Sequence, residues 1–100
     1  MGQPVATIGD STSGHGPCNP PSTLVETGGN KKVFAQRKLV VTIGGAAAVH
    51  GCKDDPPHQD IVTGGSKTVL IMKKGVARQK DGLNRGSTIT SGKKQILVGG

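Results

Sequence analysis

The chain repeats itself three times, and this repetition constrains the fold more than any other feature of the sequence. One motif reads Thr, small, Gly, polar, Lys, polar and then three apolar residues, and its copies begin at Thr27, Thr63 and Thr90. A second, mostly apolar motif begins at Pro4, Leu39 and Gly75. Since the chain starts with the second motif and ends with the first, we expect the first segment to complete the unit that the last leaves unfinished. The order predicts a closed object with pseudo-threefold symmetry.

The repeated segments have the composition of short β-strands, because they are rich in β-branched residues and bounded by Gly, Pro, Ser and Asn. We expect about nine strands, over residues 3–8, 22–27, 31–36, 39–44, 59–63, 67–72, 75–79, 87–90 and 94–98. The segments 36–38 and 72–74 are short enough to be hairpin turns, which force antiparallel pairing. Residues 46–49 are a candidate helical turn, and otherwise we expect little or no helix. The sequence predicts one all-β domain over residues 1–100.

Composition limits what such a domain can do. The 100 residues are 32% hydrophobic with a single Phe and no Trp or Tyr, while Gly counts 17. A core this thin usually needs a metal, a disulfide or a partner surface. It argues against an enzyme with a deep pocket, and we expect no enzymatic activity and no small-molecule substrate. The N-terminus has no signal-peptide pattern, so we expect cytoplasmic synthesis.

Every His and Cys lies in the two long connections, residues 9–22 and 45–58. Each connection follows a copy of the second motif, so we expect both to emerge at the same pole. A tetrahedral zinc site needs four nitrogen or sulfur ligands that converge. We predict one structural zinc ion bound by His15, His50, Cys52 and His58. Cys18 is an open alternative ligand, since His15-x-x-Cys18 is also a plausible pair.

The formal net charge of +7 suits solvated strand edges or an anionic partner. Nucleic-acid binding is disfavoured, because Phe34 is the one aromatic side chain on which a base could stack. A small, basic, zinc-stabilised nucleic-acid-binding module nevertheless stays open as the alternative function.

Together these features resemble the PAAR-repeat proteins. The resemblance rests on three repeated β-units and on the order of four motifs: Gly9-Asp10, Gly14-His15-Gly16, His50-x-Cys52…His58, and Lys74-Gly75-Val76-Ala77-Arg78, which is similar to the Pro-Ala-Ala-Arg signature. It covers essentially the whole chain.

The resemblance implies a cone that caps and sharpens the trimeric β-helical spike of a type VI secretion system or a contractile phage tail. It implies a zinc ion near the apex with three His and one Cys ligand, a base seated on the spike, and a tip that contacts the target membrane. Such a protein is assembled on the injection apparatus or virion tail and delivered outside the cell. We expect Arg37, Lys38, Lys73 and Lys74 near the base, facing an acidic spike end.

Overall fold

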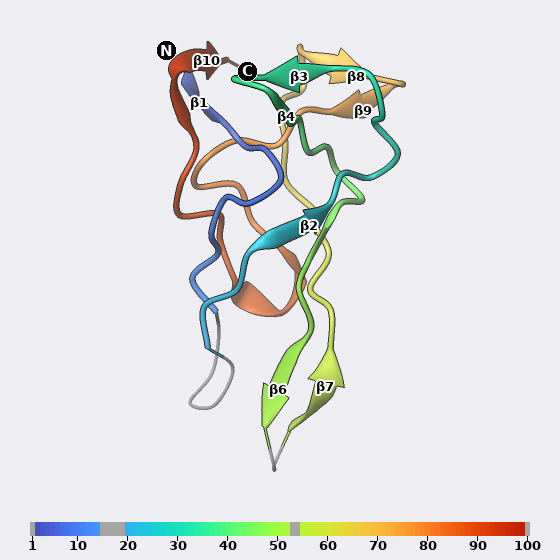
Figure 1. Cartoon of the computed structure of the whole chain (residues 1–100), viewed down its shortest axis with the longest axis vertical. Helices are drawn as coiled ribbons and strands as arrows, with labels where there is room; N and C mark the ends of the chain where they lie inside the picture. Colours follow the sequence, from blue (N-terminus) through green and yellow to red (C-terminus); the bar gives the residue numbers. More distant parts are fainter. Residues whose placement is uncertain (1, 15–19, 53–54, 100) are drawn as a thin grey trace.

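The computed structural model describes residues 2–14, 20–52 and 55–99, apart from the side chains of Cys52 and Asp55. These described residues form ten short strands (Figure 1): β1 (Gln3–Val5), β2 (Leu24–Glu26), β3 (Phe34–Ala35), β4 (Lys38–Leu39), β5 (Ala46–Ala47), β6 (His50–Cys52), β7 (Asp55–His58), β8 (Leu70–Ile71), β9 (Lys74–Gly75) and β10 (Lys93–Val98). A 3₁₀ turn, η1, covers Asn84–Gly86. The described residues contain no α-helix and no helix able to cross a membrane, which confirms the prediction of an all-β chain.

The strands pair antiparallel in five two-stranded ladders, namely β1–β10, β2–β5, β3–β4, β6–β7 and β8–β9. Two of the ladders are the predicted hairpins, with turns at Gln36–Arg37 and Met72–Lys73. All four turn residues have positive φ angles, between 50° and 70°. This is the backbone twist that two-residue hairpin loops require.

The predicted strands at 59–63 and 87–90 form isolated bridges rather than ladders. The same holds for 75–79 beyond its first residue, Gly75, which belongs to β9. In contrast, residues 45–58, expected to be a loop, contain β5, β6 and β7. The helical turn expected at 46–49 is wrong. Ala46 pairs with Glu26 on one side and with Ile61 on the other, so its backbone is held extended between two neighbours.

The three copies of the second motif hydrogen-bond to one another in a closed cycle. Ala6 N donates to Ala77 O (2.9 Å), Ala77 N to Val41 O (2.8 Å), and Val41 N to Ala6 O (3.0 Å). In a second cycle the donors lie two residues after those of the first and the acceptors two residues before. Ile8 N donates to Leu39 O, Ile43 N to Gly75 O and Gln79 N to Pro4 O. The repeats therefore associate through backbone bonds between copies, and no single sheet holds the fold together.

The core consists of small aliphatic side chains around these cycles. One buried cluster comprises Ala6, Leu24, Val41, Ala47, Val62, Ala77, Leu83 and Ile89. A second comprises Val5, Ala35, Val40, Val76 and Val98. Short side chains suit this arrangement, because three extended segments meet closely and leave little space between them.

The molecule is elongated, with principal extents of 38, 26 and 22 Å. The β3–β4 and β8–β9 hairpins and the β1–β10 ladder gather at one end, here called the basal end (Figure 1). The β6–β7 hairpin extends to the opposite end.

Candidate metal centre and basal surface

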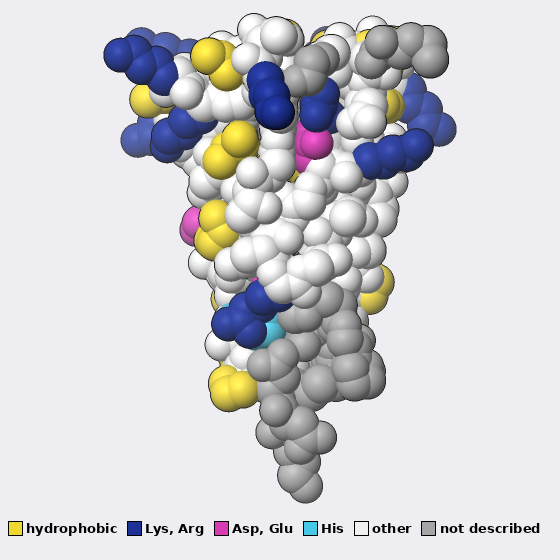
Figure 2. Space-filling model, turned by 180° about the vertical axis from the view of Figure 1, so that it is seen from behind, with side chains coloured by type: hydrophobic (Ala, Val, Ile, Leu, Met, Phe, Trp, Pro, Cys, Tyr) yellow, Lys and Arg dark blue, Asp and Glu magenta, His cyan; other side chains and the backbone are white. Residues whose placement is uncertain are grey.

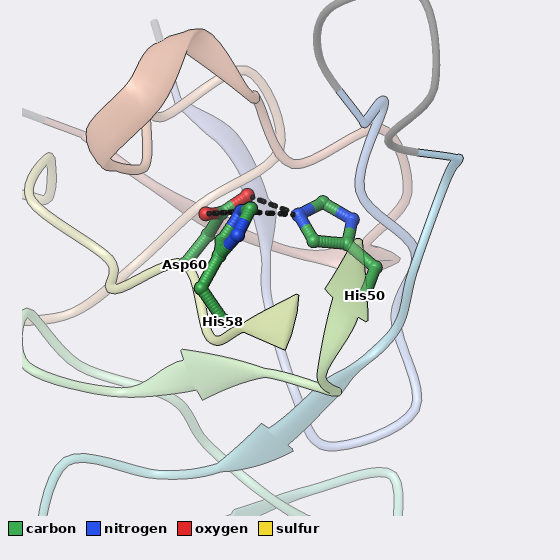
Figure 3. A group of neighbouring side chains, drawn as sticks. All are labelled: His50, His58 and Asp60. Atoms are coloured by element: carbon green, nitrogen blue, oxygen red, sulfur yellow. Dashed lines mark hydrogen bonds and ion pairs between the residues drawn. The ribbon is translucent and has the colours of Figure 1, made fainter. Parts of the chain in front are cut away.

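The β6–β7 hairpin brings His50 and His58 together. The two residues are paired directly across the ladder, so their side chains lie on the same face of the hairpin. Asp60 follows two residues after His58, and its carbonyl accepts a hydrogen bond from Ala47 N at 3.0 Å. This bond fixes the backbone at the point where the carboxylate turns towards the imidazoles (Figure 3).

Three side-chain donor groups converge at this point. Nε2 of His50 lies 3.1 Å from Nε2 of His58. Oδ2 of Asp60 lies 3.0 Å from His50 Nε2, and Oδ1 of Asp60 lies 3.2 Å from His58 Nε2. The two rings meet edge to face, with centroids 4.7 Å apart and an interplanar angle of 74°.

The second nitrogen of each ring determines the tautomer. His50 Nδ1 lies 3.0 Å from the carbonyl oxygen of Pro20, and His58 Nδ1 lies 3.0 Å from that of Pro56. A carbonyl oxygen only accepts, so each Nδ1 must carry the hydrogen. In the neutral rings, both Nε2 atoms then present lone pairs to the centre, which is the form in which His binds a metal.

The centre is almost completely shielded from water. The exposed fractions of the side chains are 5% for His50, 11% for His58 and 1% for Asp60. A buried carboxylate is costly unless a cation compensates it. Either a protonated imidazole or a bound metal ion can supply that positive charge.

The donor set fits a metal ion. Ligand atoms about 2.0–2.2 Å from a first-row divalent ion lie about 3.0–3.5 Å from one another in octahedral or tetrahedral shells. The three separations of 3.0, 3.1 and 3.2 Å fall in this range. Two imidazoles and a carboxylate suit zinc and several of its neighbours, so the group could hold a metal ion of that class.

Of the four predicted ligands, His50 and His58 lie together as described. His15 lies outside the described residues, and so does the alternative ligand Cys18. Cys52 belongs to β6, but its side chain is outside the described part. Asp60 was not among the predicted ligands, because the prediction was confined to nitrogen and sulfur ligands. The spacing His58-Gln59-Asp60 was the available signal, since alternate residues of an extended segment share a face.

A second feature is the apolar surface of the basal end. Phe34, Leu70 and Leu97 occupy matching places, since each pairs with the first residue of a second-motif copy. Their exposed fractions are 58%, 53% and 61%. Between the hairpins lies an apolar depression of about 210 Å³, whose lining includes Val33, Val69 and Ile96.

Basic side chains surround this end of the molecule (Figure 2). Arg37, Lys38, Lys73 and Lys74 are all exposed and lie in or beside the two hairpin turns. Lys74 Nζ also donates to the carbonyl of Gly28 at 2.7 Å. These four residues therefore lie at the opposite end from the β6–β7 hairpin (Figure 1).

Two buried or partly buried carboxylates outside the centre stabilise turns. Asp10 Oδ2 accepts a bond from Thr7 N at 2.8 Å, and Asp81 Oδ2 accepts one from Arg78 N at 2.8 Å. Burial alone would raise the pKa of Asp10, but hydrogen bonds from Lys93, Thr7 and Ser91 outweigh it and lower the pKa. The hydrogen-bonded Asp81 carboxylate raises the pKa of Arg78.

No protein-family model matches the chain, and a search of curated proteins finds no significant match. Its function is therefore argued from the repeat, the basal surface and the metal centre.

Proposed function

We propose that the chain is a PAAR-like tip protein that caps the trimeric β-helical spike of a contractile injection machine. The observation that carries the proposal is the apolar triplet Phe34, Leu70 and Leu97, exposed at matching places of the three repeats. A monomer with three similar surfaces can contact all three subunits of a trimer at once. Exposed apolar side chains gathered at one end are typical of an interaction surface.

We infer a pseudo-threefold cone from the same repeats. The backbone cycle through Ala6, Val41 and Ala77 supports the symmetry, because each copy donates to one neighbour and accepts from the other. Support for the taper comes from the described residues alone, whose outline is broad at the basal end and narrower away from it (Figure 2).

The basic residues at the base indicate which kind of partner surface would bind there. Arg37, Lys38, Lys73 and Lys74 would attract a spike end that carries carboxylates around an apolar centre. Complementary charge of this kind accelerates association and fixes register, while the apolar contacts supply most of the affinity.

The metal has a structural role in this proposal. We infer zinc as the ion, with His15 and Cys52 as predicted ligands in addition to His50 and His58. A bound ion supplies a cross-link where apolar cover is thin. His50 and His58 hold the two strands of the β6–β7 hairpin together, so this end resists fraying when the tip is driven into a membrane. The role requires no catalysis.

Co-purification with a cognate trimeric spike tests the proposal. We expect one copy of the chain per spike trimer by native mass spectrometry, with zinc measured on the same sample. Leu70→Glu should abolish the complex, because it places a charge in the apolar triplet. Val49→Glu is the matched control, since Val49 is equally exposed but belongs to the segment between β5 and β6.

The alternative function, a basic nucleic-acid-binding module, predicts a different result in the same experiment. It is favoured by the net charge of +7. Steeply salt-dependent binding to DNA or RNA, with no complex with any β-helical trimer, would support it against the spike-tip proposal.

A further inference from the structure

We propose that Asp60 is a direct ligand of the metal ion, so that the coordination shell contains a carboxylate as well as imidazoles. Asp60 is then a fifth ligand beside the four predicted ones, His15, His50, Cys52 and His58, and the shell expands beyond the tetrahedral set predicted from the sequence. The inference rests on the metal-binding part of the proposed function and not on the spike. The ligand set predicted from the sequence, and implied by the family resemblance, contains no carboxylate.

The repeats show that the fold does not need a carboxylate at this position. Three equivalent backbone bonds occur, one within each repeat, and they run from Thr12 N to Ser22 O, from Ala47 N to Asp60 O and from Leu83 N to Ser87 O. Asp60 therefore corresponds to a serine in both other repeats. Ser87 is as buried as Asp60, each being 1% exposed. The shared element is the backbone carbonyl, and the carboxylate is particular to the repeat that carries His50 and His58.

The orientation of the carboxylate supplies the second argument. Oδ2 faces His50 Nε2 and Oδ1 faces His58 Nε2 (Figure 3). With both Nδ1 hydrogens committed to proline carbonyls, neutral rings would direct lone pairs at the oxygens and at each other. One metal ion accepts all three lone pairs at once. Without a metal ion, these contacts between Nε2 and the carboxylate oxygens are favourable only if additional protons make the imidazole rings positively charged.

These two arrangements differ in what Asp60 does for stability. If Asp60 is a metal ligand, its replacement weakens metal binding and lowers the stability of the metal-loaded protein more than that of the metal-free protein. If it serves only as an ion-pair partner of protonated His, it stabilises the protein whether or not metal is present.

The experiment compares full-length wild type with Asp60→Ser, the residue of the other two repeats, and with Asp60→Asn. Asp81→Asn is the control, because Asp81 pairs with Arg78 and not with the imidazoles. Zn²⁺ affinity is measured by competition with a chelator, Co²⁺ coordination by the visible absorption spectrum, and thermal unfolding with and without metal.

We expect wild type and Asp81→Asn to bind one ion with similar affinity. Asp60→Ser should bind at least about 100-fold more weakly, since loss of even an outer-shell partner costs about 10–100-fold. Its Co²⁺ spectrum should change, and its metal-loaded form should lose more thermal stability than its metal-free form, each compared with wild type in the same state. Asp60→Asn should be intermediate in affinity.

Unchanged Zn²⁺ affinity and an unchanged Co²⁺ spectrum in Asp60→Ser would overturn the inference and leave the metal proposal standing. Equal destabilisation of the metal-free and metal-loaded forms would also overturn it, in favour of the ion pair. Failure of wild type to bind either ion would refute both the inference and the metal part of the proposed function, whereas spike binding would still be decided separately.

Discussion

Lys93 reaches across the fold to Asp10, with its Nζ 2.9 Å from Oδ1 of the carboxylate. The side chain of Asp10 is 7% exposed and also accepts bonds from Thr7 N and Ser91 Oγ. The contact ties the beginning of β10 to the turn that follows the first copy of the second motif. It links the two ends of a fold whose repeats close on one another.

This contact predicts acid sensitivity. Because the pKa of Asp10 is lowered in the folded protein, its contribution to stability is present above the ordinary value of 3.8 and is lost as the pH falls through the folded value. We expect the free energy of unfolding to decrease below about pH 4. Asp10→Asn should lower stability at pH 7 by about 1–3 kcal/mol and weaken the acid dependence. Urea unfolding across a pH series checks this, with the exposed Glu26→Gln as control.

Removal of metal should destabilise the β6–β7 end. We expect His50→Ala and Cys52→Ser to release the ion and lower the melting temperature, while Cys18→Ser has much less effect. Metal content and thermal unfolding of each variant provide the measurement. Loss of the ion in Cys18→Ser but not in Cys52→Ser would show that the predicted ligand set is wrong.

Replacing Arg37, a residue of the first hairpin turn, by Gly is expected to raise the stability of the chain. Arg37 has a φ of 70°, a left-handed conformation that costs a residue with a Cβ atom about 1–2 kcal/mol. Arg37→Gly should stabilise the chain by about 0.5–1 kcal/mol, after allowing for the greater entropy of unfolded Gly. Lys38→Gly, in the adjacent strand β4, should instead destabilise it. Chemical denaturation of both variants distinguishes turn strain from a general effect of Gly.

Replacement of Gly45 by Ala is expected to lower the stability of the chain. Gly45 stands where the other repeats have Asp10 and Asp81, and a Cβ atom there would lie 2.6 Å from both Glu26 O and Val41 Cγ1. Gly45→Ala should therefore cost about 1–3 kcal/mol, the usual penalty of overpacking. Gly99→Ala is the control, because a Cβ atom at Gly99 meets nothing within 4 Å. Equal stability of the two variants would contradict the packing described around Gly45.

Several features could be predicted from the residues alone. The β-branched motif copies indicated strands, and the short polar segments at 36–38 and 72–74 indicated hairpin turns, because both are local preferences of the backbone. His50 and His58 were predicted as ligands of one metal ion from their neighbourhood in one connection. The strands β6 and β7 were missed, because a segment that contains Pro56 and Pro57 has no strand-like alternation.

The tertiary structure decided those features that depend on contacts between several segments of the chain. No local pattern shows that Ala6, Val41 and Ala77 bond in a cycle, because each backbone group finds its partner in another copy of the repeat. The place of Asp60 beside two imidazoles was decided in the same way, by the bond that Ala47 donates to its carbonyl. The sequence by itself determined that the motif copies are extended and that His50 and His58 can bind a metal, since both follow from side-chain chemistry. Which of those residues share a site depended on contacts between distant segments, and these form only when the chain closes.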